Sequence, residues 1–436
     1  MVSFLTLLVG LIVGVHDVEL AVSGPVARVE IRLNDTVLAE LTEGPWRARI
    51  DIGRQIHPAR LEAVGFDAAG RETDRDVQWI NFPENRAEAE IVPEVSDVGI
   101  VETAQLTWES PEFHKPKQIR VSLDGESLAV RPPYRIDLTT VTPDELHVLD
   151  AEFEFSSDVC LKRQLAFGKG FSGATSSGLT ALPVRLDDVD ELPAPDLLSG
   201  WFVAAGDPVR VAAVDRDQAR LVIVRDPGAE PMLRELLEER KRLSKGKSRG
   251  TTSRNLDLLD EDVELRVLVP EPMAAEGRER STILFPYSRR GISGDKGLLK
   301  AAVAPKNERM LGIGLMLPDG VAMAGLHAAE GNPRRAVLLL LGSKREDITR
   351  LDPRDVRSFL KDLRVPLVVW DLSGPRGTPP SSWQADAVIE SFDDLSRATR
   401  RLRYQLDEQR IVWVGGRHLP QELELGPAAQ GISLVQ

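Results

Sequence analysis

Two glycine-containing segments have residue types found in phosphate-binding loops. Gly168-Lys-Gly170-Phe-Ser-Gly173 satisfies the pattern G-x-G-x-x-G, and Gly246-Lys247-Ser248 resembles the end of a P-loop. Such glycines bind phosphate when they lie between a strand and a helix whose amino end meets the anion. No helical pattern follows the first segment, and no strand leads into the second. We therefore interpret both segments as loops and expect no nucleotide.

Histidine, cysteine and serine show no spacing that builds a catalytic or metal centre. The six histidines are scattered without metal-ligand spacing, and no serine lies in a G-x-S-x-G elbow. Cys160, the single cysteine, lies in a predicted strand, so we expect a buried structural thiol and no disulfide within the chain. These residues favour a protein that is not an enzyme.

The composition excludes two broad classes of partner. The 436 residues include 55 Lys and Arg against 68 Asp and Glu, which gives a formal net charge of -13. A chain of this charge is not attracted to nucleic acid or to an anionic membrane, so we expect neither as the main partner. The length predicts two to four domains, each with its own core.

The apolar segment 2–15 resembles a signal peptide at first sight. No Lys or Arg precedes it, it is too short to span a bilayer, and it continues directly into an alternating strand at 17–22. We expect it to begin a first β-strand, with a residual signal segment as the alternative. The cellular compartment therefore stays open, and no transmembrane helix is expected.

Short alternating segments separated by turns dominate the amino-terminal half. In residues 18–91 the clearest unit is a hairpin at 29–41 with Asn34-Asp35 as its turn, and regular strands at this spacing indicate a β-sandwich. Residues 119–125 match 29–35 at an offset of 90, and Pro133-Tyr-Arg matches Pro45-Trp-Arg at an offset of 88. We interpret this as a tandem duplication with a two-residue deletion.

The duplicated pattern resembles bacterial immunoglobulin-like domains over roughly residues 3–185. The resemblance implies two sandwiches, 1–91 and 92–192, of a kind that usually serves as extracellular or periplasmic spacers and binding modules. The cysteine pair and buried tryptophan of antibody domains are absent, so apolar packing must hold each sandwich together.

The hydrophobic pattern changes after the proline-containing segment 192–196. Continuous apolar runs at 220–224 and 335–341 are typical of strands buried on both faces. Asp352 and Pro353 predict the start of a helix before the next strand at 366–370, which makes a βαβ unit. We expect Arg410–Val414 to close this sheet. The sequence thus predicts a doubly wound α/β domain at 198–418 and a C-terminal extension, 419–436, that either adds a strand or frays.

The order of elements in this region resembles a von Willebrand factor type A domain. The segments that carry the resemblance are the strand 221–226, the helix 319–329, and the strands 336–342 and 365–370. Immunoglobulin-like modules before such a domain are similar to the type A-related proteins of some bacteria. The resemblance implies a Rossmann-type sheet and an extracytoplasmic protein.

The metal-ion-dependent adhesion site of that family is degenerate in this sequence. The family holds Mg²⁺ or Mn²⁺ through Asp-x-Ser-x-Ser in a first loop, a Thr in a second and an Asp in a third. Here the first loop keeps Asp226 and replaces the hydroxyls, with Glu230 at its end, and Asp319 stands near the second loop without a threonine. These three acids are weak metal candidates, and we expect no metal or other cofactor.

The sequence favours a non-enzymatic interaction scaffold in which two sandwiches present a degenerate type A domain to a protein partner. Open α/β folds bind ligands at the carboxyl ends of their strands. The expected contact surface, called the rim below, consists of Asp226, Gly228, Glu230, Asp319, Gly342 and Ser343. Two alternatives stay open: a divalent-cation-dependent adhesin with a non-standard metal loop, and an unrecognised enzyme. The basic segment 240–254 is expected to be a solvated loop, or else a docking loop for an acidic partner.

Overall fold

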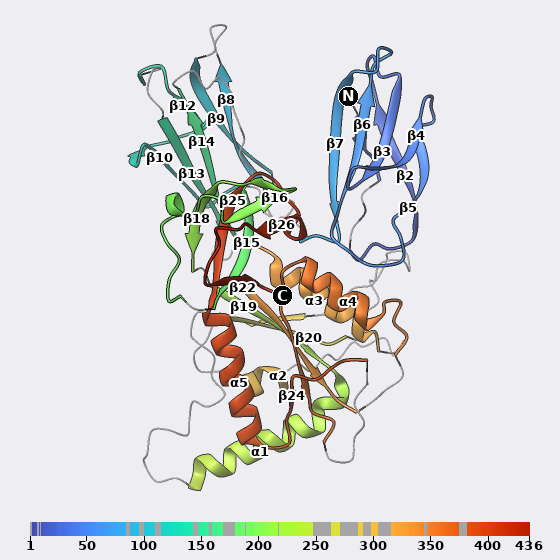
Figure 1. The fold of residues 1–436 in the computed structure, drawn as a ribbon, viewed down its shortest axis with the longest axis vertical. Helices are drawn as coiled ribbons and strands as arrows, with labels where there is room; N and C mark the ends of the chain where they lie inside the picture. Colours follow the sequence, from blue (N-terminus) through green and yellow to red (C-terminus); the bar gives the residue numbers. More distant parts are fainter. Residues whose placement is uncertain are drawn as a thin grey trace.

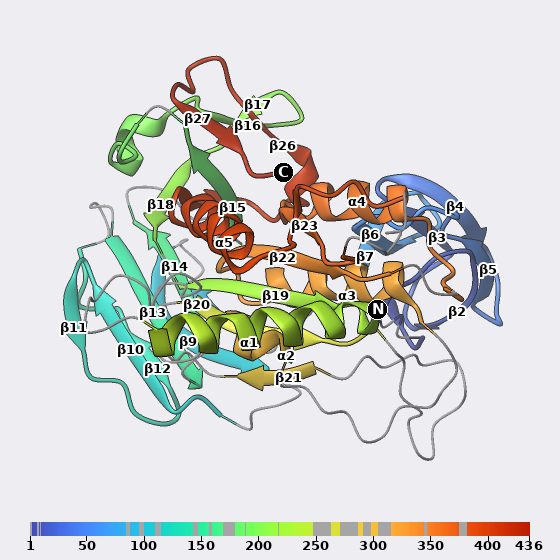
Figure 2. The ribbon, with the colours of Figure 1, turned by 90° about the horizontal axis from the view of Figure 1, so that it is seen from below.

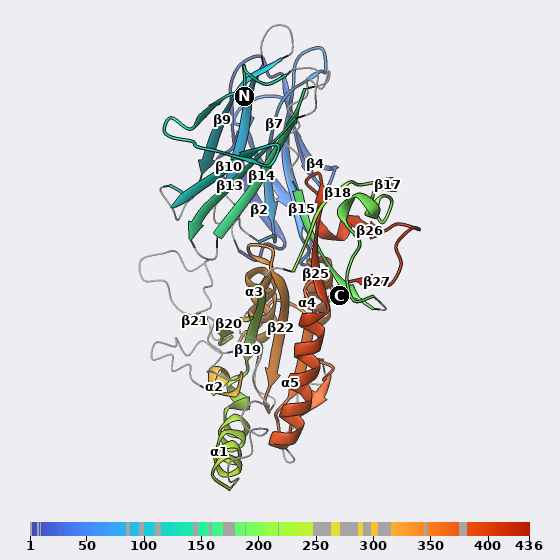
Figure 3. The same cartoon turned by 90° about the vertical axis from the view of Figure 1, so that its left-hand side faces the viewer.

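The computed structural model describes the chain in segments. The described residues are 2–6, 8, 10–83, 88–95, 100–109, 115–142, 147–156, 159–168, 179–187, 189–216, 218–246, 263–270, 287–290, 298–303, 315–343, 347–374 and 382–436. The first strands of the chain lie at one end of the molecule and helix α1 (Glu230–Gly246) at the other (Figures 1 and 3). None of the helices in these segments is both long and apolar enough to span a bilayer.

The first sandwich packs two antiparallel sheets around one apolar core. One sheet has the order β1-β2-β5 and the other β4-β3-β6-β7. Alternate residues face the core, as Val18 and Leu20 do from the first sheet and Ile31 and Leu61 from the second. The strands are β1 (Val2–Phe4), β2 (Val15–Val22), β3 (Arg28–Leu33), β4 (Thr36–Leu41), β5 (Arg47–Asp51), β6 (Ala59–Phe66) and β7 (Glu72–Ile80).

The second sandwich repeats this arrangement strand for strand. Its sheets have the orders β8-β9-β12 and β11-β10-β13-β14. Leu33 pairs with Leu61 in the first sandwich and Leu123 with Leu149 in the second, at the offsets of 90 and 88 found in the sequence. The strands are β8 (Glu88–Val95), β9 (Val101–Glu109), β10 (Gln118–Leu123), β11 (Glu126–Leu128), β12 (Arg135–Asp137), β13 (His147–Ser156) and β14 (Val159–Phe167).

A parallel sheet forms the centre of the α/β part. Its order is β21-β20-β19-β22-β23-β24, in which all neighbours are parallel except β21, which runs antiparallel to β20. Every residue of β19 and β22 is buried, as the continuous apolar runs predicted. The strands are β19 (Ala219–Arg225), β20 (Val263–Leu268), β21 (Tyr287–Arg290), β22 (Arg334–Leu341), β23 (Leu367–Asp371) and β24 (Ala387–Val388).

Helices cover both faces of this sheet (Figure 2). α1, α2 (Leu298–Val303) and α5 (Phe392–Asp407) pack on one face, while α3 (Leu317–Ala329) and α4 (Pro353–Asp362) pack on the other. The predicted helix start at Asp352 is confirmed, since Asp352 accepts a hydrogen bond from Arg354 N. Ser391 caps α5 in the same way by accepting one from Asp394 N. The described residues therefore contain β-sandwiches followed by an α/β structure.

The prediction that Arg410–Val414 closes the parallel sheet is wrong. These residues lie in β25 (Gln409–Gly415), which pairs antiparallel with β15 (Leu179–Leu186) and β18 (Val211–Asp215) in a separate sheet of order β18-β25-β15-β27. An apolar run shows that a strand is buried on both faces but not which strands lie beside it. In the sequence, the α/β structure thus lies between two chain segments that pair with each other. We call the unit formed by these segments, which contain β15 and β18 on one side and β25 on the other, the split β-unit.

The C-terminal segment adds strands to the split β-unit rather than fraying. β27 (Ile432–Leu434) pairs with β15, and β26 (Leu423–Leu425) pairs with β16 (Phe202–Ala204), which also pairs with β17 (Asp207–Pro208). One apolar core joins both chain segments, and it contains Leu182, Val184, Phe202, Val412, Val414 and Leu423. Short 3-10 turns lie beside it at Pro195–Leu198 and Pro420–Glu422.

Buried arginines line the amino edge of the parallel sheet, where the carboxyl ends of the helices return. Arg220 donates hydrogen bonds to the carbonyls of His327 and Glu330 at the end of α3. Arg335 donates to the carbonyl of Ala329 at 3.4 Å, and to those of Leu363 and Arg364, after α4, at 3.3 Å each.

Arg334 has the same role at the last turn of α5, where it donates to the carbonyl of Leu406 at 2.9 Å. The last carbonyls of a helix have no partner within the helix and carry its partial negative charge. Burial, and then the charge of Arg220, lowers the pKa of Arg335 to about 9, so Arg335 stays cationic at neutral pH. The arginines therefore satisfy both the hydrogen-bonding need and the charge of α3, α4 and α5.

Arg220, Arg334 and Arg335 form what we call the arginine layer, and Arg364 extends it to the split β-unit. It follows α4 with a φ of 55°, the left-handed conformation that usually selects glycine at the end of a helix. Its guanidinium donates to the carbonyls of Pro420 at 3.3 Å and Leu423 at 3.0 Å. The side chain thus joins the end of α4 to the C-terminal segment.

The first sandwich also contacts the α/β structure. Ile56, in the loop before β6, is 2% exposed and belongs to the core formed by α3, α4 and the sheet. Gln55 Nε2 donates to Asp355 Oδ1 on α4 at 3.2 Å, and Gln421 Nε2 donates to the carbonyl of Pro58 at 2.9 Å. The first sandwich is therefore packed against α4 and the split β-unit.

Replacement of Arg335 by methionine tests the arginine layer. Arg335→Met should lower the free energy of unfolding by about 3 kcal/mol, because three carbonyls each lose a hydrogen bond from the guanidinium while the apolar stem is kept. Arg354→Met, at an exposed position on α4, is the control and should change it by less than about 0.5 kcal/mol. Urea denaturation measures both, and equal losses in the two variants would contradict a structural role for the layer.

Candidate functional site

Asp226 holds together two loops at the carboxyl edge of the parallel sheet. It follows β19, is 1% exposed and caps the short 3-10 turn Pro227–Ala229. Its Oδ1 accepts a hydrogen bond from Gly228 N at 2.8 Å, and its Oδ2 accepts one from Gly342 N, after β22, at 2.8 Å. The carboxylate therefore connects the loop after β19 to the loop after β22.

Two glycines allow these loops to touch through their backbones. A Cβ at Gly342 would lie 2.0 Å from Gly228 C and 2.2 Å from Ala229 N. A Cβ at Gly228 would lie 3.0 Å from the carbonyl oxygen of Ser343. The predicted rim residues Asp226, Gly228, Gly342 and Ser343 are thus brought together, and their contact closes this part of the sheet edge.

Glu230 is held by two arginines. It begins α1, where Arg234 Nε donates to its Oε1 at 2.7 Å and Arg225, the last residue of β19, binds its Oε2. Arg225 is 6% exposed. The charge of Glu230 is therefore compensated, and its oxygens are directed toward guanidinium groups rather than toward Asp226.

Asp319 lies in the first turn of α3 and is 1% exposed. Its Oδ2 accepts hydrogen bonds from the Thr349 hydroxyl and, at 3.3 Å, from Arg350 N, while its Oδ1 lies 3.6 Å from Arg350 Nε. Sequence analysis missed Thr349, because no pattern connects a loop after β22 with a helix residue 30 positions earlier.

Asp347 and Ile348 are two further rim residues that the sequence did not identify. Asp347 forms a bridge to Leu315 just before α3, and Ile348 is 42% exposed. Partial burial raises the pKa of Asp347, and the charges of Asp319 and Asp226 raise it further. The rim is therefore acidic in its interior and offers an apolar side chain at its surface.

The arrangement at the rim is built for loop packing. Within the described segments, no group of three or more His, Cys, Asp or Glu side chains is placed to hold a metal ion. Ser343 Oγ lies 3.5 Å from the carbonyl of Ser373, after β23, which brings a third loop to the same edge. The three weak metal candidates do not converge on one point, because each is bound to different partners.

Other residues singled out in the sequence have structural roles or lie outside the described residues. Arg220 uses the backbone carbonyl of His327 as a hydrogen-bond acceptor. The backbone of Cys160 lies in β14, and its side chain lies outside the described structure. Residues 169–178 and 247–262, which include most of both glycine motifs and most of the basic segment, also lie outside it.

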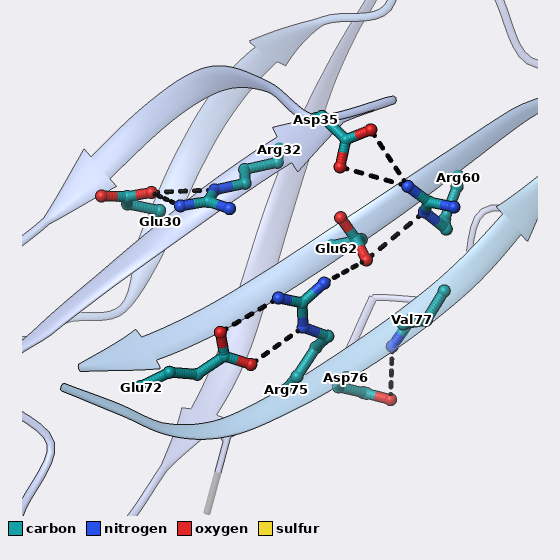
Figure 4. A network of polar contacts seen from close by, with 9 residues as sticks. All are labelled: Glu30, Arg32, Asp35, Arg60, Glu62, Glu72, Arg75, Asp76 and Val77. Atoms are coloured by element: carbon teal, nitrogen blue, oxygen red, sulfur yellow. Dashed lines mark hydrogen bonds and ion pairs between the residues drawn. The ribbon is translucent and has the colours of Figure 1, made fainter. Parts of the chain in front are cut away.

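A second polar cluster covers the outer face of the first sandwich (Figure 4). Glu62, 2% exposed, lies between Arg75 at 2.8 Å and Arg60 at 3.3 Å. Arg60 also pairs with Asp35, and Arg75 pairs with Glu72. The hydrogen bond between Arg75 and Glu72 raises the pKa of Arg75. Since opposite charges alternate across the strands, this face compensates its own charge.

Comparisons with known proteins identify no family. No family profile matches the chain, and no curated relative was found. Proximal thread matrix protein 1 (PTMP1) from the mussel byssus, solved with a zinc-occupied MIDAS motif, is 15% identical with a TM-score of 0.28. The match covers 47% of this chain and 50% of that chain, so this chain spans about half of that protein.

Two fibronectin structures also match parts of the chain. The fibronectin(III)-like modules of CbhA from Clostridium thermocellum are 17% identical with a TM-score of 0.16, over 38% of this chain and 93% of that chain. The central fibronectin-III array of RIM-binding protein is 10% identical with a TM-score of 0.23, over 48% and 83%. Likenesses of this size establish neither a family nor a function.

The glycine contact at the rim predicts different effects of the same substitution at its two sides. Gly342→Ala should lower the free energy of unfolding by about 3 kcal/mol, because its methyl group would overlap backbone atoms that have no rotamer to change. Gly228→Ala, the matched control, meets its nearest neighbour at 3.0 Å and should cost about 1 kcal/mol. Thermal unfolding compares the two, and the reverse order would contradict the close loop contact.

Proposed function

We propose that this protein is a non-enzymatic interaction scaffold whose rim binds a protein partner without a metal ion. In this proposal two immunoglobulin-like sandwiches, tandem duplicates of each other, present a type A-like α/β domain. The observation that carries the proposal is the engagement of the rim acids: Asp226 binds two backbone N–H groups and Glu230 binds two arginines. Carboxylates used in this way hold loops in place rather than a cation.

The fold supports such a role through rigidity. The α/β structure lies between the two segments of the split β-unit, and Arg364 and Ile56 connect it to its neighbours. A surface fixed on several packed bodies loses little conformational freedom on binding. Ile348, which is exposed and follows Asp347 in the chain, supplies the apolar contact that protein interfaces use at their centre.

A charge placed on the rim tests the proposal. Immobilised full-length protein is used to capture partners from an extract of its source, and bound proteins are quantified with wild type, Ile348→Arg and Val37→Arg. Ile348→Arg should reduce capture of the specific partner about tenfold or more. Val37, on β4 of the first sandwich, is 49% exposed against 42% for Ile348, so Val37→Arg is the matched control and should leave capture unchanged.

The same experiment distinguishes the alternatives. Capture in EDTA should equal capture in millimolar Mg²⁺ or Mn²⁺, because the proposal uses no cation. Capture that requires a divalent cation would support the metal-dependent adhesin instead. Loss of capture in Val37→Arg but not in Ile348→Arg would move the binding surface to the sandwich and reject the rim.

A further inference from the structure

His147 lies between two hydrogen-bond acceptors at one end of the second sandwich. It is the first residue of β13 and is 8% exposed. Its Nδ1 lies 2.7 Å from Asp124 Oδ2, in the turn between β10 and β11, and its Nε2 lies 2.8 Å from the carbonyl oxygen of Thr142. Neither acceptor group carries a proton of its own in its ordinary state.

This geometry requires one proton more than a neutral imidazole and a carboxylate provide. A carbonyl oxygen only accepts, so Nε2 must carry a hydrogen. A neutral ring then has a lone pair on Nδ1, which would face the carboxylate lone pairs at 2.7 Å. A second proton between Nδ1 and Oδ2 turns this repulsion into a charge-assisted hydrogen bond.

The carboxylate has a further reason to stay ionised. Asp124 Oδ1 accepts a hydrogen bond from Val148 N at 2.7 Å. The hydrogen bond from His147, followed by that from Val148, lowers the pKa of Asp124. The extra proton therefore belongs to the ring, which makes His147 an imidazolium.

The first sandwich contains the same turn without this pair. Asn34 Oδ1 accepts from Arg60 N at 2.8 Å, as Asp124 Oδ1 accepts from Val148 N. At the offset of 88, Ala59, which is fully buried, stands where the second sandwich has His147. The hairpin thus forms without an Asp–His pair, and this pair adds a dependence on protons that the turn itself does not need.

Asp124 is a charged group in direct contact with the imidazole of His147. From β14, the Phe167 ring lies 5.6 Å from the imidazole, centroid to centroid, and covers it with an apolar surface. Thr142 contributes its backbone carbonyl. Residues 143–146, which include Asp144 and Glu145, lie outside the described structure.

We propose that His147 is a proton-dependent latch that fastens the Asp124 turn and the Thr142 segment to the start of β13. Phe167, the partner of His147 in the β13–β14 pair, is the last residue of β14, from which the chain continues toward β15 of the split β-unit. The protonated latch therefore keeps one end of the second sandwich structured, and this is the end at which the sandwich joins the rest of the molecule.

The direction of the pH dependence follows from proton linkage. The folded state binds the extra proton and the unfolded histidine releases it near its ordinary value of about 6.5. The stability that the latch contributes is thus complete at mildly acidic pH. It is lost as the pH rises through the pKa of His147 in the folded state, which is higher than in the unfolded state. At strongly acidic pH, protonation of Asp124 removes it from the other side.

Asp124→Asn is the decisive variant, because it copies the Asn34 turn of the first sandwich. The asparagine Oδ1 still accepts from Val148 N, and its amide donates to a neutral His147 Nδ1. Nitrogen-15 NMR of histidine-labelled full-length protein follows the ring, with His147→Gln to assign the signal. We expect the wild-type midpoint about one pH unit or more above that of Asp124→Asn. Equal midpoints, or a neutral ring in wild type at pH 6, would overturn the latch.

Hydrogen exchange gives a second readout with a control inside the same chain. Val148 N binds Asp124, and Arg60 N binds Asn34, in the two equivalent turns. After correction for intrinsic exchange, protection of Val148 relative to Arg60 should fall about tenfold between about pH 6 and 8.5 in wild type. The ratio should stay constant in Asp124→Asn, and a constant ratio in wild type would also reject the proposal.

Discussion

Buried guanidinium groups at the amino edge of the parallel sheet hold the α/β structure together. In a right-handed βαβ arrangement, every helix returns its carboxyl end to this edge, where its last carbonyls have no partner and carry partial negative charge. Arg220, Arg334 and Arg335 bring cationic donors to those carbonyls from the strands themselves. Without them, packing the helices against the sheet would bury unsatisfied carbonyls, which costs more than the apolar contact of a single side chain gains.

The opposite edge follows the same electrostatic rule with the sign reversed. Aspartates gather at the amino ends of the helices and of the 3-10 turn, where backbone N–H groups are free to be bound. Asp226 binds the N–H groups of Gly228 and Gly342 in this way, and Asp319 Oδ2 binds the Thr349 hydroxyl and Arg350 N. An edge organised like this presents a fixed surface, which agrees with the proposed role in binding another protein.

The sequence predicted the local structure well where neighbouring residues decide it. The hairpin at Asn34, the cap at Asp352 and the buried runs of β19 and β22 depend on residues close in the chain, and all were confirmed. The pairing of β25 with β15 was not predicted, since it joins residues more than 200 positions apart and both candidate sheets suit the same apolar run. Within the rim, the partners of Asp226 and Asp319 were not predictable either, because they come from loops whose approach depends on the whole fold. Arg220 and the Arg334-Arg335 pair, each directly before an apolar run, were visible signs of the arginine layer.

The most direct test of this account is the stability of Arg364→Gly. Glycine is the preferred residue at the left-handed position after a helix and by itself should stabilise the chain by about 1 kcal/mol. If the guanidinium joins α4 to the split β-unit, its loss from the Pro420 and Leu423 carbonyls should outweigh this gain and lower the free energy of unfolding by about 2 kcal/mol. Asn332→Gly, at a φ of 57° after α3, is the control and should change stability by less than about 0.5 kcal/mol. An Arg364→Gly protein as stable as wild type, or more so, would contradict the central role of the arginine layer.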